Sequence, residues 1–167
     1  VEGNAIDIAR RFAEIVQGQV TVHTRFLTAT VKWDGRSVDF ATARSETYSR
    51  PGALPAVKSG SIDEDLFRRD FTINSLAAAV PSGTLIDPYN GRKDIEERLV
   101  RVLHEKSFIN DATRIWRAIR YEQRLGFTLE PDTLKILKRD LDMLDTISRD
   151  RVRHAVSYTH LRAHETV

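Results

Sequence analysis

The dipeptide Asp34-Gly35 lies between two stretches with alternating apolar residues, and this feature constrains the fold more than any other local pattern. The first stretch is residues 26–33 and the second is residues 36–44. Alternation with a period of two is typical of β-strands, and Asp-Gly is typical of a two-residue hairpin turn. We therefore predict an antiparallel hairpin whose apolar face carries Leu27 and pairs Trp33 with Arg36, Val31 with Val38 and Ala29 with Phe40.

The opposite face of this predicted hairpin pairs Thr30 with Asp39 and Thr28 with Ala41. Asp39 is therefore expected on the side away from the core, among small side chains, where a ligand or metal ion could approach. An Asp in such a place is more often an ordinary solvent-side residue, and the pattern alone leaves both interpretations open.

Other local patterns predict a mixed α and β half followed by a helical half. A helix is expected over residues 5–16, with Ile8, Phe12, Ile15 and Val16 on its apolar side. A mobile loop should follow at 49–60, then a helix opened by a capping box at 61–64, a second hairpin from 75–80 and 84–87, a short helix at 93–98 and a strand or turn at 100–103. Beyond Lys106 the pattern is wholly helical, with helices at 111–126, at 131–140 and from about Ser148.

Composition excludes several classes of protein. The 167 residues contain no Cys, which excludes disulfide frameworks, thiol nucleophiles and Cys-based zinc sites. No apolar run approaches membrane-spanning length and no secretory segment opens the chain, so we expect a cytoplasmic protein with no membrane partner. Arg supplies 20 of the 26 basic residues, but the net charge is only +2. An anion-binding site should therefore be a local cluster of guanidinium groups.

Residues 68–74 form one such cluster, at the end of the helix that the capping box opens. Guanidinium groups donate in pairs to phosphate oxygens, and Asp and Asn side chains bind hydroxyl groups. The cluster could therefore hold a triphosphate and a ribose through Arg68, Arg69, Asp70 and Asn74. The alternative is a surface salt-bridge cluster.

A second cluster lies in the predicted helix at 111–126. Steps of three place four charged groups along one side of this helix, namely Asp111, Arg114, Arg117 and Arg120. The opposite side is expected to pack against the core through Ala112, Ile115, Trp116 and Ile119. If it lies beside the first cluster, the charged side could present a protein edge for base pairing. The alternative is a salt-bridged structural face.

Four segments together resemble the class II tRNA nucleotidyltransferase and bacterial poly(A) polymerase family. They are residues 38–44 (VDFATAR), 65–74 (DLFRRDFTIN), 86–91 (IDPYNG) and 111–121 (DATRIWRAIRY), and they follow the order found in the family. The resemblance runs from about Val1 to Ala155. It implies an α+β fold with a partial polymerase-β-type nucleotidyltransferase head, an antiparallel or mixed sheet with helices, over residues 1–105. An all-helical neck over residues 106–155 would follow.

The resemblance also implies roles for individual residues. Asp39 would be the third catalytic, metal-associated carboxylate, with Mg²⁺ as the metal. The nucleotide site would use Arg69 for the phosphates, Asp70 for the ribose, Asn74 beside it, Asp111 and Arg114 for the base, and Arg117 and Arg120 to complete the pocket. The expected activity is addition of C and A, or of A alone, from CTP and ATP to the 3′ end of tRNA. A poly(A) polymerase of the same family and a non-catalytic nucleotide- or RNA-binding module are the alternatives, and the motifs do not indicate an oligomeric state.

The base-reading pair has a physical rationale. Cytosine and adenine each place an exocyclic amino donor beside a ring-nitrogen acceptor, which an Asp acceptor and an Arg donor complement. Uracil and guanine place a carbonyl and an N–H there and are mismatched. The family usually has an acidic residue where this chain has Asn110, so the balance between C and A is open.

Two departures from the family affect the expected activity. Its Gly-rich phosphate loop and paired D-x-D carboxylates come immediately before the segment that residues 1–5 match, so we expect a truncated enzyme whose 167-residue chain has no transferase activity of its own. Residues 156–166 resemble the translation of a DNA-sequencing adapter, with a genuine helical tail as the alternative. The adapter interpretation excludes His160 and His164 as metal ligands.

Overall fold

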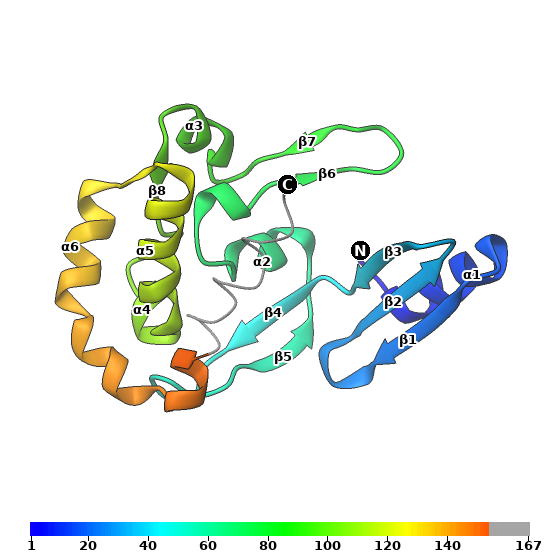
Figure 1. The fold of residues 1–167 in the computed structure, drawn as a ribbon, viewed down its shortest axis with the longest axis horizontal. Coiled ribbons are helices and arrows are strands. Elements are labelled where there is room, and N and C mark those ends of the chain that lie inside the picture. Colours follow the sequence, from blue (N-terminus) through cyan, green and yellow to red (C-terminus); the bar gives the residue numbers. More distant parts are fainter. Residues whose placement is uncertain (154–167) are drawn as a thin grey trace. The chain divides into compact units, whose positions relative to one another are not determined.

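The computed structural model describes residues 1–153 and combines helices with small sheets (Figure 1). The chain divides into two compact units. Unit 1 comprises residues 1–47 and 56–68, and unit 2 comprises residues 48–55 and the chain from residue 69 onward. No helix within residues 1–153 is long and apolar enough to cross a membrane. The suspected adapter sequence, residues 156–166, lies outside the described part.

Unit 1 is built on a three-stranded antiparallel sheet. Its strands are β1 (Gln19–His23), β2 (Thr28–Trp33) and β3 (Arg36–Ala41), in the order β1-β2-β3. The predicted hairpin register is confirmed, because Thr30 lies opposite Asp39 and Val31 opposite Val38. Both turn residues, Asp34 and Gly35, have positive φ angles, as the tight hairpin turn requires.

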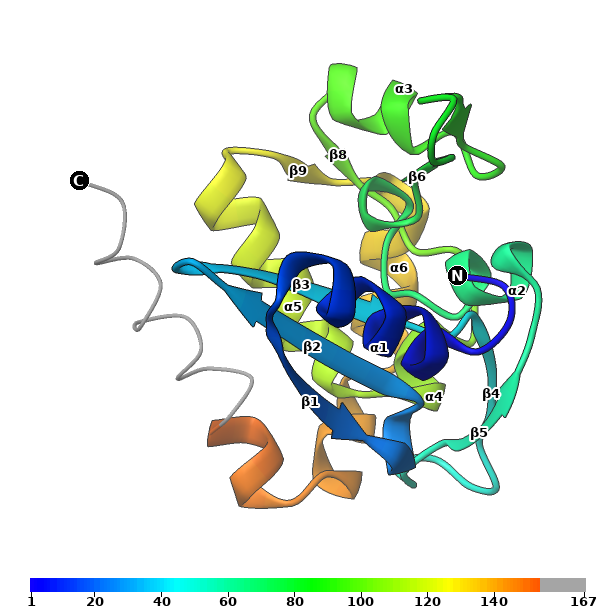
Figure 2. The same ribbon diagram turned by 90° about the vertical axis from the view of Figure 1, so that its right-hand side faces the viewer.

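Helix α1 (Ala5–Val16) covers one face of this sheet (Figure 2). The helix bounds agree with the prediction, but the predicted packing face is partly wrong. Ile8 and Ile15 are 41% and 80% exposed. Small residues at steps of four, Ala5, Ala9 and Ala13, are buried instead. They let the helix approach the sheet closely, and Phe12 and Val16 pack at the edge of this core.

The rest of unit 1 differs from the prediction in its strands. Strand β1 was missed, and β2 begins only at Thr28, because a 3₁₀ turn, η1 (Thr24–Phe26), precedes it. The predicted loop at 49–60 contains strand β5 (Ala56–Ser59), which pairs with β4 (Arg44–Thr47). Each of these strands is specified by its partner more than by its own residues.

Helix α2 (Ile62–Phe67) begins at the predicted capping box, which is confirmed by the reciprocal bonds of Ser61 and Glu64. Arg68 follows this helix and donates hydrogen bonds to Asp65 and Glu46 at 2.8 and 3.0 Å. For Arg68, therefore, the ion-pair interpretation is confirmed.

Unit 2 contains the second predicted hairpin and most of the helices. In chain order its elements are η2 (Thr72–Asn74), β6 (Ala77–Ala78), β7 (Leu85–Ile86), α3 (Gly91–Glu96), β8 (Leu99–Val100), α4 (Ser107–Asn110), α5 (Thr113–Leu125), β9 (Thr128–Leu129), α6 (Pro131–Arg139) and η3 (Leu141–Thr146). Residues 149–153 are again helical, close to the predicted start. The expectation of a wholly helical chain beyond Lys106 is wrong, because β9 pairs in parallel with β8.

The core of unit 2 lies between α5, α6 and these two short strands. Its buried members are Phe71, Val100, Val102, Phe108, Ile115, Ala118, Leu129 and Leu137. Phe71 reaches this core from the segment just after Asp70, so the first sequence cluster is attached directly to the packed interior. The position of that cluster is therefore coupled to the packing of α5.

Gly91 begins α3 in contact with the backbone of η2. A Cβ atom at this position would lie 2.2 Å from the carbonyl oxygen of Thr72. We expect Gly91→Ala to lower the free energy of unfolding by about 3 kcal/mol, because backbone atoms must move apart. Urea unfolding followed by circular dichroism measures this loss. Gly83→Ala is the control, since a Cβ there meets no atom within 4 Å and only its φ of +73° is strained, at a cost of about 1 kcal/mol. Equal losses would contradict a steric role for Gly91.

Candidate functional site

Asp70 joins the two sequence clusters within unit 2. Its carboxylate is buried, at 7% exposure. Arg117 of α5 donates to Asp70 Oδ2 from Nε at 2.6 Å, and its Nη2 lies 2.5 Å from the same oxygen. The two clusters therefore lie side by side. This proximity is the condition under which the charged side of the helix could recognise a base.

The other oxygen of Asp70 organises the turn that follows it. Asp70 Oδ1 accepts from the backbone N–H of Phe71 at 3.0 Å and from Asn74 Nδ2 at 2.9 Å. Arg69 Nη1 donates to the carbonyl oxygen of Asn74 at 2.9 Å. We call Arg69, Asp70, Asn74 and Arg117 the Asp70 cluster. Because each member is bonded to another, the cluster is held in one arrangement before any ligand arrives.

Electrostatics keep Arg117 charged. Burial by itself lowers the pKa of Arg117, but the Asp70 carboxylate opposes burial strongly enough that the net shift is upward. The guanidinium also lies over the Tyr121 ring, 5.6 Å from its centroid. Arg117 can therefore offer positive charge to an anionic ligand at any physiological pH.

Asp111 precedes α5, and its two carboxylate oxygens have different surroundings. Oδ1 accepts from Thr113 N at 3.0 Å, from Thr113 Oγ1 at 2.7 Å and from Arg151 Nη2 at 3.0 Å. Among the described residues, no donor bonds to Oδ2. The side chain keeps 24% exposure. One oxygen is thus fixed by the protein, and the other can accept a hydrogen bond from a ligand.

Arg114 is buried, which corrects the expectation that the whole charged row faces away from the core. It is 5% exposed, whereas Ile119, expected on the packed side, is 40% exposed. Arg114 Nη1 donates to Ser107 Oγ of α4 at 2.8 Å. The short helix α4 was not predicted, and it supplies a polar partner for an Arg that lies on the packed side. Arg120, by contrast, is only half-buried.

The charge of Arg114 also affects a neighbouring imidazole. Burial lowers the pKa of His104, and the positive charges of Arg114 and Lys106 lower it further. The environment of His104 therefore favours the neutral imidazole.

Asp39 belongs to unit 1. It is exposed on β3 and accepts a hydrogen bond from Thr30 Oγ1 at 2.6 Å, on the sheet face opposite α1. No group of three or more His, Asp or Glu side chains in residues 1–153 is arranged to hold a metal ion. The described residues therefore do not by themselves fit a metal site, although the exposed carboxylate of Asp39 could supply one ligand.

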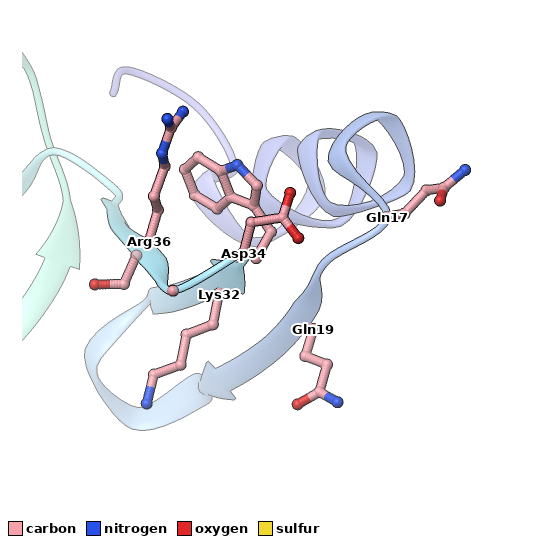
Figure 3. A pocket seen from close by; sticks show the side chains of 8 residues that line it. Gln17, Gln19, Lys32, Asp34 and Arg36 are labelled. Atoms are coloured by element: carbon pink, nitrogen blue, oxygen red, sulfur yellow. The ribbon is translucent and has the colours of Figure 1, made fainter.

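Unit 1 also has an open hollow of about 600 Å³ at the turn of the hairpin (Figure 3). The residues that line it are Gln17, Gln19, Lys32, Trp33, Asp34, Gly35, Arg36 and Ser37. Lys32 and Arg36 extend to different sides and do not converge on one point (Figure 3). None of the candidate residues lines this hollow, so the chemistry of the Asp70 cluster, not the size of a hollow, defines the candidate site.

Comparison with known proteins agrees with this geometry. The family model described as the poly A polymerase head domain matches residues 1–101. The chain belongs to the poly A polymerase head domain family. The A-adding tRNA nucleotidyltransferase of Aquifex aeolicus is 46% identical over 157 residues, which cover 91% of this chain and 19% of that protein.

Two solved structures are also similar to this chain. A CCA-adding enzyme in an apo form is 38% identical, with a TM-score of 0.89 over 94% of this chain and 38% of the other. A tRNA nucleotidyltransferase complexed with a primer tRNA and an incoming ATP analog is also 38% identical, with a TM-score of 0.81 over 93% and 44%. The chain thus spans less than half the length of each of these relatives.

Several residues that bond to the candidate site were not predicted from the sequence. Ser107 bonds to Arg114, and Arg151 bonds both to Asp111 and, at 2.8 Å, to the carbonyl oxygen of Gly52. A further ion-pair network joins the buried carboxylates of Asp94 and Glu130 to the partly exposed guanidinium of Arg101. These partners are separated by 7 to 99 positions in the sequence, and no local periodicity signals them.

Glu130 gives this network a pH dependence. Burial raises the pKa of Glu130, but hydrogen bonds from Thr133 and from the Asp132 backbone, together with the charge of Arg101, lower it more, so the net shift is downward. A carboxylate with a depressed folded-state pKa stabilises the fold above its unfolded pKa, about 4.3, and loses that contribution as the pH falls further.

We therefore expect Glu130→Gln to lower the free energy of unfolding by about 2 kcal/mol at pH 7. The difference from the wild-type chain should shrink toward zero between about pH 4.5 and pH 3. Urea unfolding at a series of pH values measures it, and Asp132→Asn, in an exposed pair with Lys135, is the control. A difference that stays constant with pH would contradict the assignment.

Proposed function

We propose that this chain is part of a template-independent RNA nucleotidyltransferase that adds C and A, or A alone, to the 3′ end of tRNA. The observation that carries the proposal is the position of α5. The same helix carries Arg117, which binds Asp70, and it follows directly on Asp111 and contains Arg114. Residues proposed to bind sugar, phosphate and base therefore lie along one helix and the turn bonded to it.

The roles of these residues follow from their chemistry. In this proposal Arg69, Arg117 and Arg120 provide positive charge for the phosphates, and Asp70 with Asn74 binds a ribose hydroxyl. Oδ2 of Asp111 accepts a hydrogen bond from the exocyclic amino group of cytosine or adenine. Arg114, oriented by Ser107, donates to the adjacent ring nitrogen. A uracil or guanine would bring a carbonyl oxygen toward the Asp111 carboxylate and would be rejected.

The remaining parts of the proposal concern the whole enzyme. Nucleotidyl transfer generally uses divalent metal ions, and we propose Mg²⁺ with Asp39 as one ligand. Residues 1–153 lack the further ligands such a site needs. We also propose the division into a head, residues 1–105, and a helical neck, residues 106–155, and a location in the cytoplasm with the tRNA substrate.

The full-length protein that carries this chain tests the function directly. It would be incubated with Mg²⁺, radiolabelled nucleotides and tRNA transcripts ending either before the terminal CCA or after CC. Incorporation of CTP and ATP, but not of UTP or GTP, supports C and A addition. Incorporation of ATP only after CC supports an A-adding enzyme. Long A tails on unrelated RNA would instead indicate a poly(A) polymerase, and no incorporation of any nucleotide would overturn the proposal.

A further inference from the structure

Thr72, the first residue of η2, forms hydrogen bonds with both members of the ion pair between Asp94 and Arg101. Its backbone N–H donates to the carbonyl oxygen of Arg101 at 2.9 Å, and its hydroxyl donates to Asp94 Oδ2 at 2.6 Å. Arg101 Nε in turn donates to both oxygens of Asp94, at 3.2 and 3.1 Å. Backbone and side chain of Thr72 are thus fixed by residues that are bonded to each other.

This arrangement is buried. Thr72 and Asp94 are each 3% exposed. The first turn of α3 brings Asp94 to this place, and its Gly91 lies so close to the Thr72 carbonyl that no Cβ fits between them. A buried carboxylate is costly unless it is fully paired, and apolar residues of similar size often stabilise a fold as well. The stability of the fold therefore gives little reason for a carboxylate at residue 94. What the Asp94 carboxylate does provide is a fixed orientation of the Thr72 side chain.

The turn that Thr72 begins is part of the Asp70 cluster. Asn74 ends η2 and contributes its side chain to Asp70 and its carbonyl oxygen to Arg69. A rotation of η2 would move both contacts together. The direction of the Arg69 guanidinium and the orientation of the Asp70 carboxylate therefore depend on how Thr72 is held.

We propose that Asp94 is a positioning residue for nucleotide binding, acting through Thr72 to hold η2 and with it Arg69 and Asn74. This inference rests on the proposed function for its ligand, ATP. Asp94 touches the Thr72 hydroxyl and the Arg101 guanidinium and none of the residues assigned to the ligand. Its effect on affinity must therefore pass through the turn.

The first test measures ATP binding to the full-length protein that carries this chain by isothermal titration calorimetry. Asp94→Asn and Thr72→Val should each weaken binding by about tenfold, as expected for loss of one hydrogen bond to a charged group. The double variant should bind ATP no more weakly than Asp94→Asn alone, because in this proposal Asp94 acts on η2 through Thr72. Thr72→Ser keeps the hydroxyl and should bind as the wild-type chain does.

Two controls separate positioning from stability. Asp132→Asn removes an exposed carboxylate and should leave binding unchanged, and Leu137→Ala destabilises the core of unit 2 from helix α6 while every residue of η2 stays the same. Circular dichroism establishes that every variant is folded at the temperature of measurement. If Leu137→Ala weakens ATP binding as much as Asp94→Asn does, or if folded Asp94→Asn binds ATP normally, the positioning role is overturned.

A second measurement needs no nucleotide. In the wild-type chain the Asn74 side-chain amide should exchange slowly with solvent in ¹H–¹⁵N spectra, because it is bonded to Asp70. Asp94→Asn should raise that exchange rate about tenfold or more while the core amides of α5 stay protected. An unchanged rate at Asn74 overturns the inference. If the full-length protein binds neither ATP nor CTP but Asn74 still loses protection in Asp94→Asn, the result counts against the proposed function and not against the hold of Asp94 on η2.

Discussion

In the full-length protein, Arg114→Met is expected to lower kcat/KM for each nucleotide that the proposed nucleotidyltransferase adds by at least about a hundredfold. The guanidinium is the proposed donor to the ring nitrogen of the incoming base, and its 5% exposure means that little water can replace it. Met has a similar volume and no charge, so the space beside Ser107 stays filled. Steady-state incorporation into tRNA lacking its terminal nucleotides measures the effect.

Arg124→Met is the matched control for this variant. Arg124 lies in the last turn of the same helix and is exposed, so its replacement should leave both nucleotides incorporated normally. Circular dichroism should show both variants folded, because an apolar residue of similar volume often replaces a buried ion without loss of stability. If folded Arg114→Met incorporates nucleotides normally, Arg114 does not recognise the base, and the charged side of α5 is a salt-bridged structural face.

The ion pair of Asp70 and Arg117 is expected to show strong coupling in a double-mutant cycle. Asp70→Ala should lower the free energy of unfolding by about 3 kcal/mol, since it leaves the buried donors of Phe71 and Asn74 without their acceptor. Arg117→Ala should cost about 1–2 kcal/mol, the smaller figure reflecting the 41% exposure of its side chain.

The double variant should be no less stable than Asp70→Ala alone, which gives a coupling energy of about 1–2 kcal/mol. Urea unfolding of all four chains under identical conditions provides the cycle. Arg124→Ala in place of Arg117→Ala is the control pair and should be additive with Asp70→Ala, because Arg124 is exposed in the last turn of α5. Strict additivity for Asp70 and Arg117 would show that the short contact contributes nothing beyond its two separate side chains.

The sequence predicted those parts of the fold that depend on residues close together in the chain. The hairpin register follows from alternation and from the turn at Asp34-Gly35, and the capping box of α2 needs only Ser61 and Glu64. Strands β1 and β5 pair with the neighbouring strands β2 and β4, and they were missed because both are short and mostly exposed. Strand β9 was missed because it has two residues and pairs with β8 across two intervening helices. The apolar side of α1 was misjudged because close packing on the sheet favours small Ala residues over Ile8 and Ile15.

The candidate site shows the same division. The charged row along α5 is visible as a sequence pattern, and the contact of Asp70 with Arg117 agrees with it. The burial of Arg114 could not be predicted, because it depends on the hydroxyl of Ser107 from an unpredicted helix. The partner of Asp111, Arg151, lies forty positions away, and only tertiary structure brings the two together.

The path of the chain between the two units has a topological consequence. It enters unit 2 at residue 48, returns to unit 1 at 56 and enters unit 2 again at 69, so three peptide connections join the units. A single proteolytic cut in any of them leaves two connections intact, and the two resulting peptides are then held together only by packing within a unit to which both contribute. Neither unit is one continuous segment of the sequence. Replacing a unit with the corresponding unit of a relative therefore requires three junctions instead of one.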